Sequence, residues 1–193
     1  MAAQVTALGE EIVAAIGRRR ATGAVVSAEQ AARAAAAAAD EWGVERALLA
    51  DDPVLAELGV GDALGADGRE VLRWPEGRGA GWRELLGLEG PELTLGVTVP
   101  VLGVAERGTL VLETGPAHGR SIDVVSMYHL AVLPASRIRA TLAEALTEAY
   151  AGGRAPSAIS LVSAPSRTSD IEKISTLGAH GAKGLHVIVV EDR

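Results

Sequence analysis

The fold is decided near the end of the chain by two apolar runs, Ala158-Ile-Ser-Leu-Val-Ser163 and Leu185-His-Val-Ile-Val-Val190. Between them lie Ser163-Ala-Pro-Ser-Arg-Thr-Ser-Asp-Ile-Glu172 and Leu177-Gly-Ala-His-Gly-Ala-Lys-Gly184, which gather hydroxyl, acidic, basic and imidazole side chains. Short apolar runs of this kind indicate buried strands. Loops that such strands hold in place carry much of the ligand chemistry of α/β proteins. The sequence therefore predicts an α/β protein with a functional loop in its last third.

Helical and strand patterns alternate through the rest of the chain, which favours a mostly parallel sheet covered on both faces. We expect a helical N-terminal segment over 1–42 and an α/β domain over 43–193, together forming a single globular unit. Apolar spacing and caps predict helices over 3–20, 27–42, 53–58, 82–88 and 136–150. Strands are predicted over 44–50, 70–74 and 128–133, with short ones in 93–114 that would suit an antiparallel hairpin. The remainder of 59–80 reads as an exposed connection.

Composition excludes several classes of function. The 193 residues carry a formal net charge of −7, which argues against a nucleic-acid partner because phosphate neutralisation needs a basic surface. The absence of cysteine excludes disulfides, thiol catalysis and cysteine-ligated iron–sulfur clusters. The N-terminus does not read as a signal peptide, and the alanine run 31–39 is too short to span a membrane. We therefore expect a cytoplasmic protein without a membrane contact.

The stretch Pro165-Ser166-Arg167-Thr168 is the strongest candidate binding element. It follows a predicted strand and is expected to precede a helix, whose first N–H groups attract anions while hydroxyl and guanidinium groups add donors. A pocket for a carboxylate or a phosphate is one interpretation. In the other, Ser169 or Asp170 only caps a short helix and Arg167 pairs with a surface acid. Glu172 is the better candidate general base if Asp170 is the cap.

Two further loops could contribute to the same site. His180 lies between Gly178 and Gly181, which suggests a tight turn that exposes the imidazole or brings the chain close to a ligand. In Gly103-Val-Ala-Glu-Arg-Gly-Thr109, the side chains of Glu106 and Thr109 could face a pocket while Gly108 allows close approach, although a plain hairpin turn explains this stretch equally well. His129 reads as a core histidine, and no histidine pair has metal-ligand spacing, so no metal site is expected.

The ordered set of motifs resembles the lactate-utilisation protein C family, the stand-alone LUD-domain proteins. The resemblance rests on Pro165–Glu172, Leu177–Gly181 and Leu185–Val190, and on three upstream stretches in the same order, Gly96–Thr98, Val104–Leu112 and His129–Arg137. It covers about residues 93–190 and adds Thr98 to the candidate ligand-binding residues. Two features depart from the family pattern, Arg107 before Gly108 and Val99-Pro100 after Thr98.

The resemblance implies a three-layer α/β/α fold like that of the ribose-phosphate isomerase, glucosamine-phosphate deaminase and CoA-transferase superfamily. It also implies a role in bacterial oxidation of L-lactate to pyruvate beside iron–sulfur partner proteins, and it assigns no catalytic residues. We expect an accessory component that binds a small carboxylate, a phosphate or a partner, holds no cofactor of its own, and could form a homodimer. The alternatives are an independent isomerase or acyl-transferase that uses Glu106 or Glu172, with His180 as a further polar candidate, and a non-catalytic regulatory or structural subunit.

Overall fold

A computed structural model of the chain describes residues 2–74, 94–119, 122–151, 156–169, 175–177 and 181–191. Side chains are described in these ranges except at 2–5, 168–169 and 175–177. The predicted helix at 82–88 lies outside the described residues. Four candidate site residues lie outside them as well: Asp170, Glu172, Gly178 and His180.

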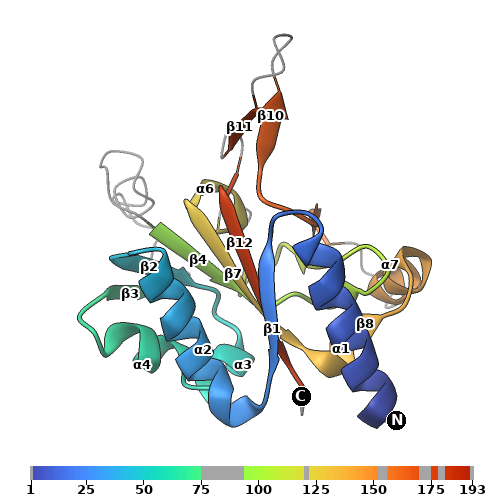
Figure 1. Ribbon diagram of the computed structural model, residues 1–193, viewed down its shortest axis with the longest axis horizontal. Coiled ribbons are helices and arrows are strands. Elements are labelled where there is room, and N and C mark those ends of the chain that lie inside the picture. The colour runs from blue at the N-terminus through green and yellow to red at the C-terminus, as the bar shows by residue number, and fades with distance from the viewer. Residues whose placement is uncertain are drawn as a thin grey trace.

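A six-stranded parallel sheet forms the centre of the molecule (Figure 1), which confirms the predicted α/β class. Its neighbouring strands follow the order β1-β12-β7-β4-β2-β3, and all five pairings are parallel. The neighbouring interior strands β7 and β12 are almost continuously apolar because both of their faces are covered. The strands are β1 (Thr22–Val26), β2 (Arg46–Leu49), β3 (Glu70–Arg73), β4 (Thr94–Thr98), β7 (Tyr128–Pro134) and β12 (Gly184–Val190).

Helices pack on both faces of this sheet. One face is covered by α2 (Ala28–Glu41), α3 (Pro53–Glu57) and α4 (Val60–Gly65), whose buried residues join a core with alternate residues of the central strands. The small alanines of α2 let that helix lie close to the sheet. On the opposite face, α1 (Ala2–Gly17) buries Ile12 and Ile16 in a second core. No helix in the described part of the chain has the length and apolar character needed to cross a membrane.

A second sheet of four strands covers the rest of the α1 face, in the order β8-β5-β6-β9. The predicted hairpin is confirmed, because β5 (Leu102–Val104) and β6 (Thr109–Glu113) pair in antiparallel fashion. β8 (Ile138–Arg139) runs parallel to β5, and β9 (Ile159–Val162) is the edge strand beside β6. The expectation that β9 is buried is wrong, since an edge strand is covered only in part and Leu161 is 47% exposed.

Three local expectations from the sequence are corrected. Thr22–Val26 is a strand that is not among the predicted elements, and Gly23 is needed there because a Cβ would lie 2.9 Å from the carbonyl oxygen of Val187. α4 lies within the stretch expected to be an exposed connection. The last long helix, α7 (Leu142–Tyr150), begins at Thr141 instead of Ser136, because Thr141 and Glu144 form a capping box.

The division at residue 42 remains a prediction about domain organisation. The structure adds that β1 and α2, which precede residue 43, both contact β12 directly. The two remaining strands, β10 (Arg167–Ser169) and β11 (Ser175–Leu177), pair only with each other and project beyond the rest of the molecule (Figure 1).

Candidate functional site

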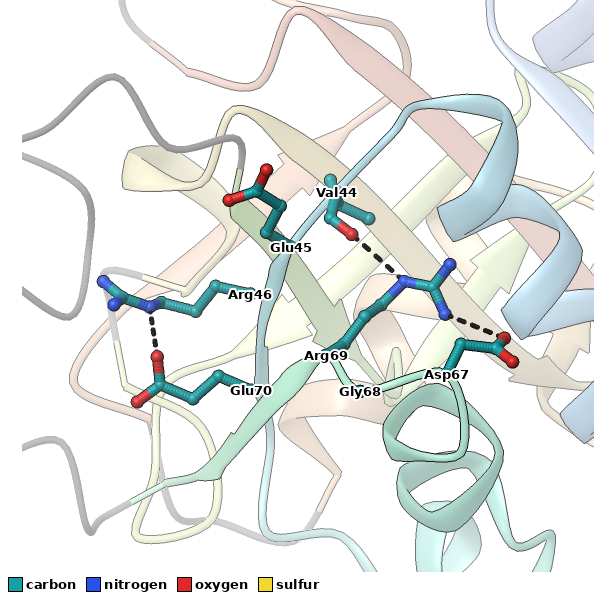
Figure 2. A pocket seen from close by; sticks show the side chains of 7 residues that line it. All are labelled: Val44, Glu45, Arg46, Asp67, Gly68, Arg69 and Glu70. Carbon is teal, nitrogen blue, oxygen red and sulfur yellow. Dashed lines mark hydrogen bonds and ion pairs between the residues drawn. The ribbon is translucent and has the colours of Figure 1, made fainter.

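One hollow, of about 430 Å³, lies at the amino ends of β2 and β3 (Figure 2). Its two arginines are already engaged with the protein. Arg69 donates to the carbonyl of Val44 at 3.0 Å and pairs with Asp40, and Arg46 pairs with Glu70 at 2.7 Å. Because these guanidinium groups hold α2, β2 and β3 together, we interpret this hollow as structural.

A smaller hollow of about 230 Å³ lies between the two sheets, at the amino ends of β7 and β12. The short helix α6 (Ile122–Val125), which precedes β7, forms one wall, and β9 with the residues that follow it forms another. The described lining consists of Asp123, Val124, His129, Ser160, Leu161, Val162, Ser163, Ala164, Pro165, Ser166, Gly181, Ala182 and Leu185.

Asp123 is the acidic group of this hollow. Its side chain is only 3% exposed, and burial raises the pKa of the carboxyl group, with a backbone hydrogen bond and the charge of His118 acting in the opposite direction. His118 Nε2 lies 3.9 Å from Asp123 Oδ1. Asp123 therefore lines the hollow, and its carboxyl group lies beside an imidazole.

The ring of His118 is oriented by the backbone. Its Nδ1 lies 3.3 Å from the carbonyl oxygen of Glu113, and since a carbonyl oxygen only accepts, Nδ1 carries the hydrogen. In the neutral ring, Nε2 then has a free lone pair, and this buried atom has no hydrogen-bond partner. The arrangement leaves a base directed at Asp123.

His129 forms part of the floor of the hollow and is uncharged near neutral pH. Burial lowers its pKa to about 3, with the charge of His118 as a smaller cause. Its Nε2 lies 2.8 Å from Thr98 Oγ1, a buried hydrogen bond. This confirms the expectation of a satisfied core histidine, although the ring also borders the hollow.

Hydroxyl groups line the opposite side. Ser160, Ser163 and Ser166 contribute to the lining, and Ser163 Oγ lies 2.8 Å from Thr109 Oγ1. The Ser166 N–H donates to the carbonyl of Ala182 at 2.8 Å, which ties the two loops of the hollow together. Two apolar side chains among the lining residues, Val124 and Leu161, are 46% and 47% exposed.

The structure brings part of the predicted ligand set to this hollow. Pro165, Ser166 and Gly181 line it directly. Thr98 and Thr109 lie behind it, each within hydrogen-bond distance of a lining residue. The assignment of all of these residues to ligand binding remains a prediction.

Other predicted residues lie elsewhere. Glu106 Oε1 accepts the N–H of Leu142 at 3.0 Å, so this carboxylate caps α7 and does not line the hollow. Gly108, with a φ of +59°, packs against the backbone of α1, where a Cβ would lie 2.7 Å from the amide nitrogen of Ile16. The close approach expected at Gly108 is therefore to a helix of the protein rather than to a ligand.

The expected helix after Pro165 is wrong where the structure describes the chain. Arg167, Thr168 and Ser169 form β10 and pair with β11, because the segment folds back as a hairpin. Arg167 is exposed at the start of β10 and is not among the described lining residues. The anion-binding N–H groups of a helix start are thus not provided by residues 165–169.

Sequence reasoning missed Asp123 and treated His118 as an isolated residue. The two lie on a loop and a short helix that carry no recognisable motif, and only the fold brings them beside β7 and β9. No group of three or more histidine, cysteine or acidic residues within the described ranges is arranged to hold a metal ion. The described polar groups of the hollow can form hydrogen bonds and transfer protons.

Comparison with known proteins agrees with this architecture. The chain is similar to a DUF162 family protein from Deinococcus radiodurans, whose crystal structure matches with a TM-score of 0.64 over 98% of both chains at 22% identity. That likeness supports the fold alone.

The chain is also similar in sequence to proteins from several bacteria. The chain is 34% identical over 172 residues to the "Uncharacterized protein YkgG" of Escherichia coli (strain K12), covering 87% of this chain and 72% of that protein. It is 31% identical over 158 residues to "Lactate utilization protein C" of Halalkalibacterium halodurans, covering 80% of this chain and 66% of that protein. A protein of the same name from Bacillus subtilis is 29% identical, with 76% and 62% covered.

The chain therefore spans between about three fifths and three quarters of the length of these three relatives. The family model described as "LUD domain" matches residues 9–190, which is nearly the whole chain and includes every wall of the hollow. Together with the relative that is 34% identical, this match establishes that the chain belongs to the LUD-domain family.

Proposed function

We propose that the chain is an accessory component of bacterial L-lactate utilisation, which assists the oxidation of L-lactate to pyruvate beside iron–sulfur partner proteins. The observation that carries the proposal is the similarity over most of the chain to relatives named Lactate utilization protein C. The absence of cysteine fits a component that leaves electron transfer to cluster-bearing partners.

In this role the hollow between the sheets binds a small carboxylate. Its polar groups are grouped on one side as hydroxyls and on the other as a carboxyl and an imidazole, with apolar walls between them. A volume of about 230 Å³ is below the range of about 300–1,000 Å³ that is usual for larger ligands, so it suits a small metabolite.

The test is lactate-dependent dye reduction by the iron–sulfur partner proteins, measured with and without the purified chain. Omitting the chain is expected to lower the rate several-fold, and adding Ser166→Ala in place of the natural chain is expected to restore less of it. Arg167→Ala serves as the matched control, because Arg167 neighbours Ser166 but is exposed outside the described lining. A rate that does not depend on the chain would refute the proposal.

A second candidate is an independent enzyme that transfers protons, which the position of Asp123 between the hollow and His118 favours. This candidate replaces Glu106, which caps α7, with Asp123 as the acid–base group. Turnover of a sugar phosphate or a CoA ester by the purified chain alone, lost in Asp123→Asn, would favour it over the accessory role.

A further inference from the structure

We propose that the hollow takes up a small monocarboxylate together with one proton, and that the Asp123–His118 pair holds this proton. The inference rests on the proposed function, since it assumes that the ligand is a carboxylate. It adds which residues of the chain compensate the charge of the ligand and how affinity depends on pH.

The first step is the charge balance of the hollow. Neither lysine nor arginine is among the described residues that line it. Two described cations are sequence neighbours of lining residues: the ammonium group of Lys183 lies 5.3 Å from the centre of the Tyr128 ring, and Arg167 is exposed on β10. His129 is also uncharged near neutral pH. Among the described lining residues, no cation therefore separates Asp123 from a carboxylate that enters.

The second step is the consequence for Asp123. Two carboxyl groups that share a small site cannot both be ionised at low cost, and such pairs bind one proton between them. The carboxyl group of Asp123 is almost completely buried, so water screens the repulsion poorly. Binding of a monocarboxylate anion from neutral solution must then be accompanied by one proton from the solvent.

The third step identifies where the proton resides. His118 Nε2 lies 3.9 Å from Asp123 Oδ1, it is buried, and it has no hydrogen-bond partner. The hydrogen bond from Nδ1 to the Glu113 carbonyl holds the ring so that this lone pair stays directed at the acid. The proton can be held by the carboxyl group, which then donates to the ligand, or by Nε2. The burial that raises the pKa of Asp123 acts in the same direction.

The shape of the hollow defines the class of ligand. Ser160, Ser163 and Ser166 offer hydroxyl groups to a carboxylate or to a hydroxyl or oxo substituent beside it. Val162 and Leu185 offer an apolar surface for a short alkyl group. These features together suit a 2-hydroxy or 2-oxo acid with a short side chain.

The experiment is calorimetric titration of the purified chain with L-lactate, and in parallel with pyruvate and acetate, from about pH 5.5 to about pH 8.5. The affinity of the natural chain is expected to weaken by up to about tenfold for each pH unit once the pair has lost its proton. Titrations in two buffers of different ionisation enthalpy count the protons directly, and the expected uptake approaches one per ligand at the alkaline end.

Asp123→Asn supplies the decisive variant, because the amide has the shape of the protonated acid and no charge. It is expected to bind the probe with an affinity independent of pH and, at about pH 8, more tightly than the natural chain.

His118→Asn keeps a donor for the Glu113 carbonyl but removes Nε2. Because this variant lacks the second group that could hold the proton, it is expected to lose its affinity at a lower pH than the natural chain. Asp62→Asn, on the exposed side of α4, is the control and should match the natural chain.

The outcomes separate this inference from the proposed function. Binding of L-lactate with no proton uptake in the natural chain, or an unchanged pH profile in Asp123→Asn, would overturn the inference and leave carboxylate binding standing. Failure of all three probes to bind the natural chain and folded Asp123→Asn at the acidic end would overturn both. Melting curves establish that each variant is folded, and the proton count in the natural chain decides the matter without any variant.

Discussion

His129 makes the native state sensitive to acid, and the structure sets the size of the effect. The ring is buried between β4 and α6, it bonds Thr98, and burial lowers its pKa to about 3 from the ordinary 6.5. Between these two values the unfolded chain binds a proton at this position that the native state excludes. The stabilising contribution is therefore complete above about pH 6.5 and is lost as the pH falls towards 3.

The magnitude follows from the difference between the two pKa values. Each pH unit corresponds to about 1.4 kcal/mol, so lowering the pH from 6.5 to 5 removes about 2 kcal/mol of the free energy of unfolding. The full difference of about 3.5 units, from 6.5 to about 3, sets an upper limit of about 5 kcal/mol. For a domain near the lower end of ordinary stability, about 5 kcal/mol, the loss by pH 5 is a large fraction of the total.

The assay is urea denaturation at several pH values between about 4.5 and about 8, applied to the natural chain and to His129→Gln. The glutamine amide can still donate to Thr98 Oγ1 but does not titrate. The pH slope of the free energy of unfolding is expected to fall by nearly one proton in the variant. His186→Gln is the matched comparison, because burial also lowers the pKa of His186 while the charge of Glu41 opposes it, so its slope should change less. Equal slopes in the natural chain and His129→Gln would refute the reasoning.

Two further substitutions test the walls of the hollow. Thr98→Val leaves His129 Nε2 unpaired in a buried position, so it should lower the free energy of unfolding, measured in urea, by about 1–3 kcal/mol. Thr109→Val should lower it by only about 0.5–1.5 kcal/mol, because Ser163 is less buried and its hydroxyl can turn to water. Equal losses in the two variants would contradict this account. Gly96→Ala places a Cβ 2.3 Å from the carbonyl oxygen of Ile122, so this oxygen must move. We expect the free energy of unfolding to fall by about 1–3 kcal/mol and L-lactate to bind more weakly. An unchanged urea midpoint and an unchanged affinity would show that α6 is not held against β4 at this residue.

Much of the fold could be predicted because the relevant signals are local. The apolar runs of β7 and β12 identify central strands without any knowledge of their partners. The capping box at Ser27 and the Asp52-Pro53 pair mark the starts of α2 and α3, and the structure shows Asp52 accepting the Val54 N–H at 2.9 Å. β1 was missed because Gly23 interrupts its pattern, and its need for glycine comes from a contact with β12 far along the chain.

The second sheet marks the limit of this reasoning. β9 and β12 both read as apolar strands, yet β12 lies in the parallel sheet and β9 lies at the edge of the other. Strand pairing depends on which surfaces remain uncovered after the helices have packed, and a strand's own residues do not specify it. Similarly, a hydroxyl-rich loop after β9 suggests a helix start, but pairing with β11 makes it extended.

The position of the hollow explains why its acidic residue escaped prediction. In open α/β sheets, ligands usually bind at the carboxyl ends of the strands, and sequence reasoning looks for motifs there. Here the hollow lies at the amino ends of β7 and β12, where β9 and the residues that follow it form one wall. Asp123 precedes β7, so the residue that faces this space comes before a buried strand instead of after it. When a family places a second sheet over the amino edge of the first, acids and histidines just upstream of central strands therefore become candidates equal to those downstream.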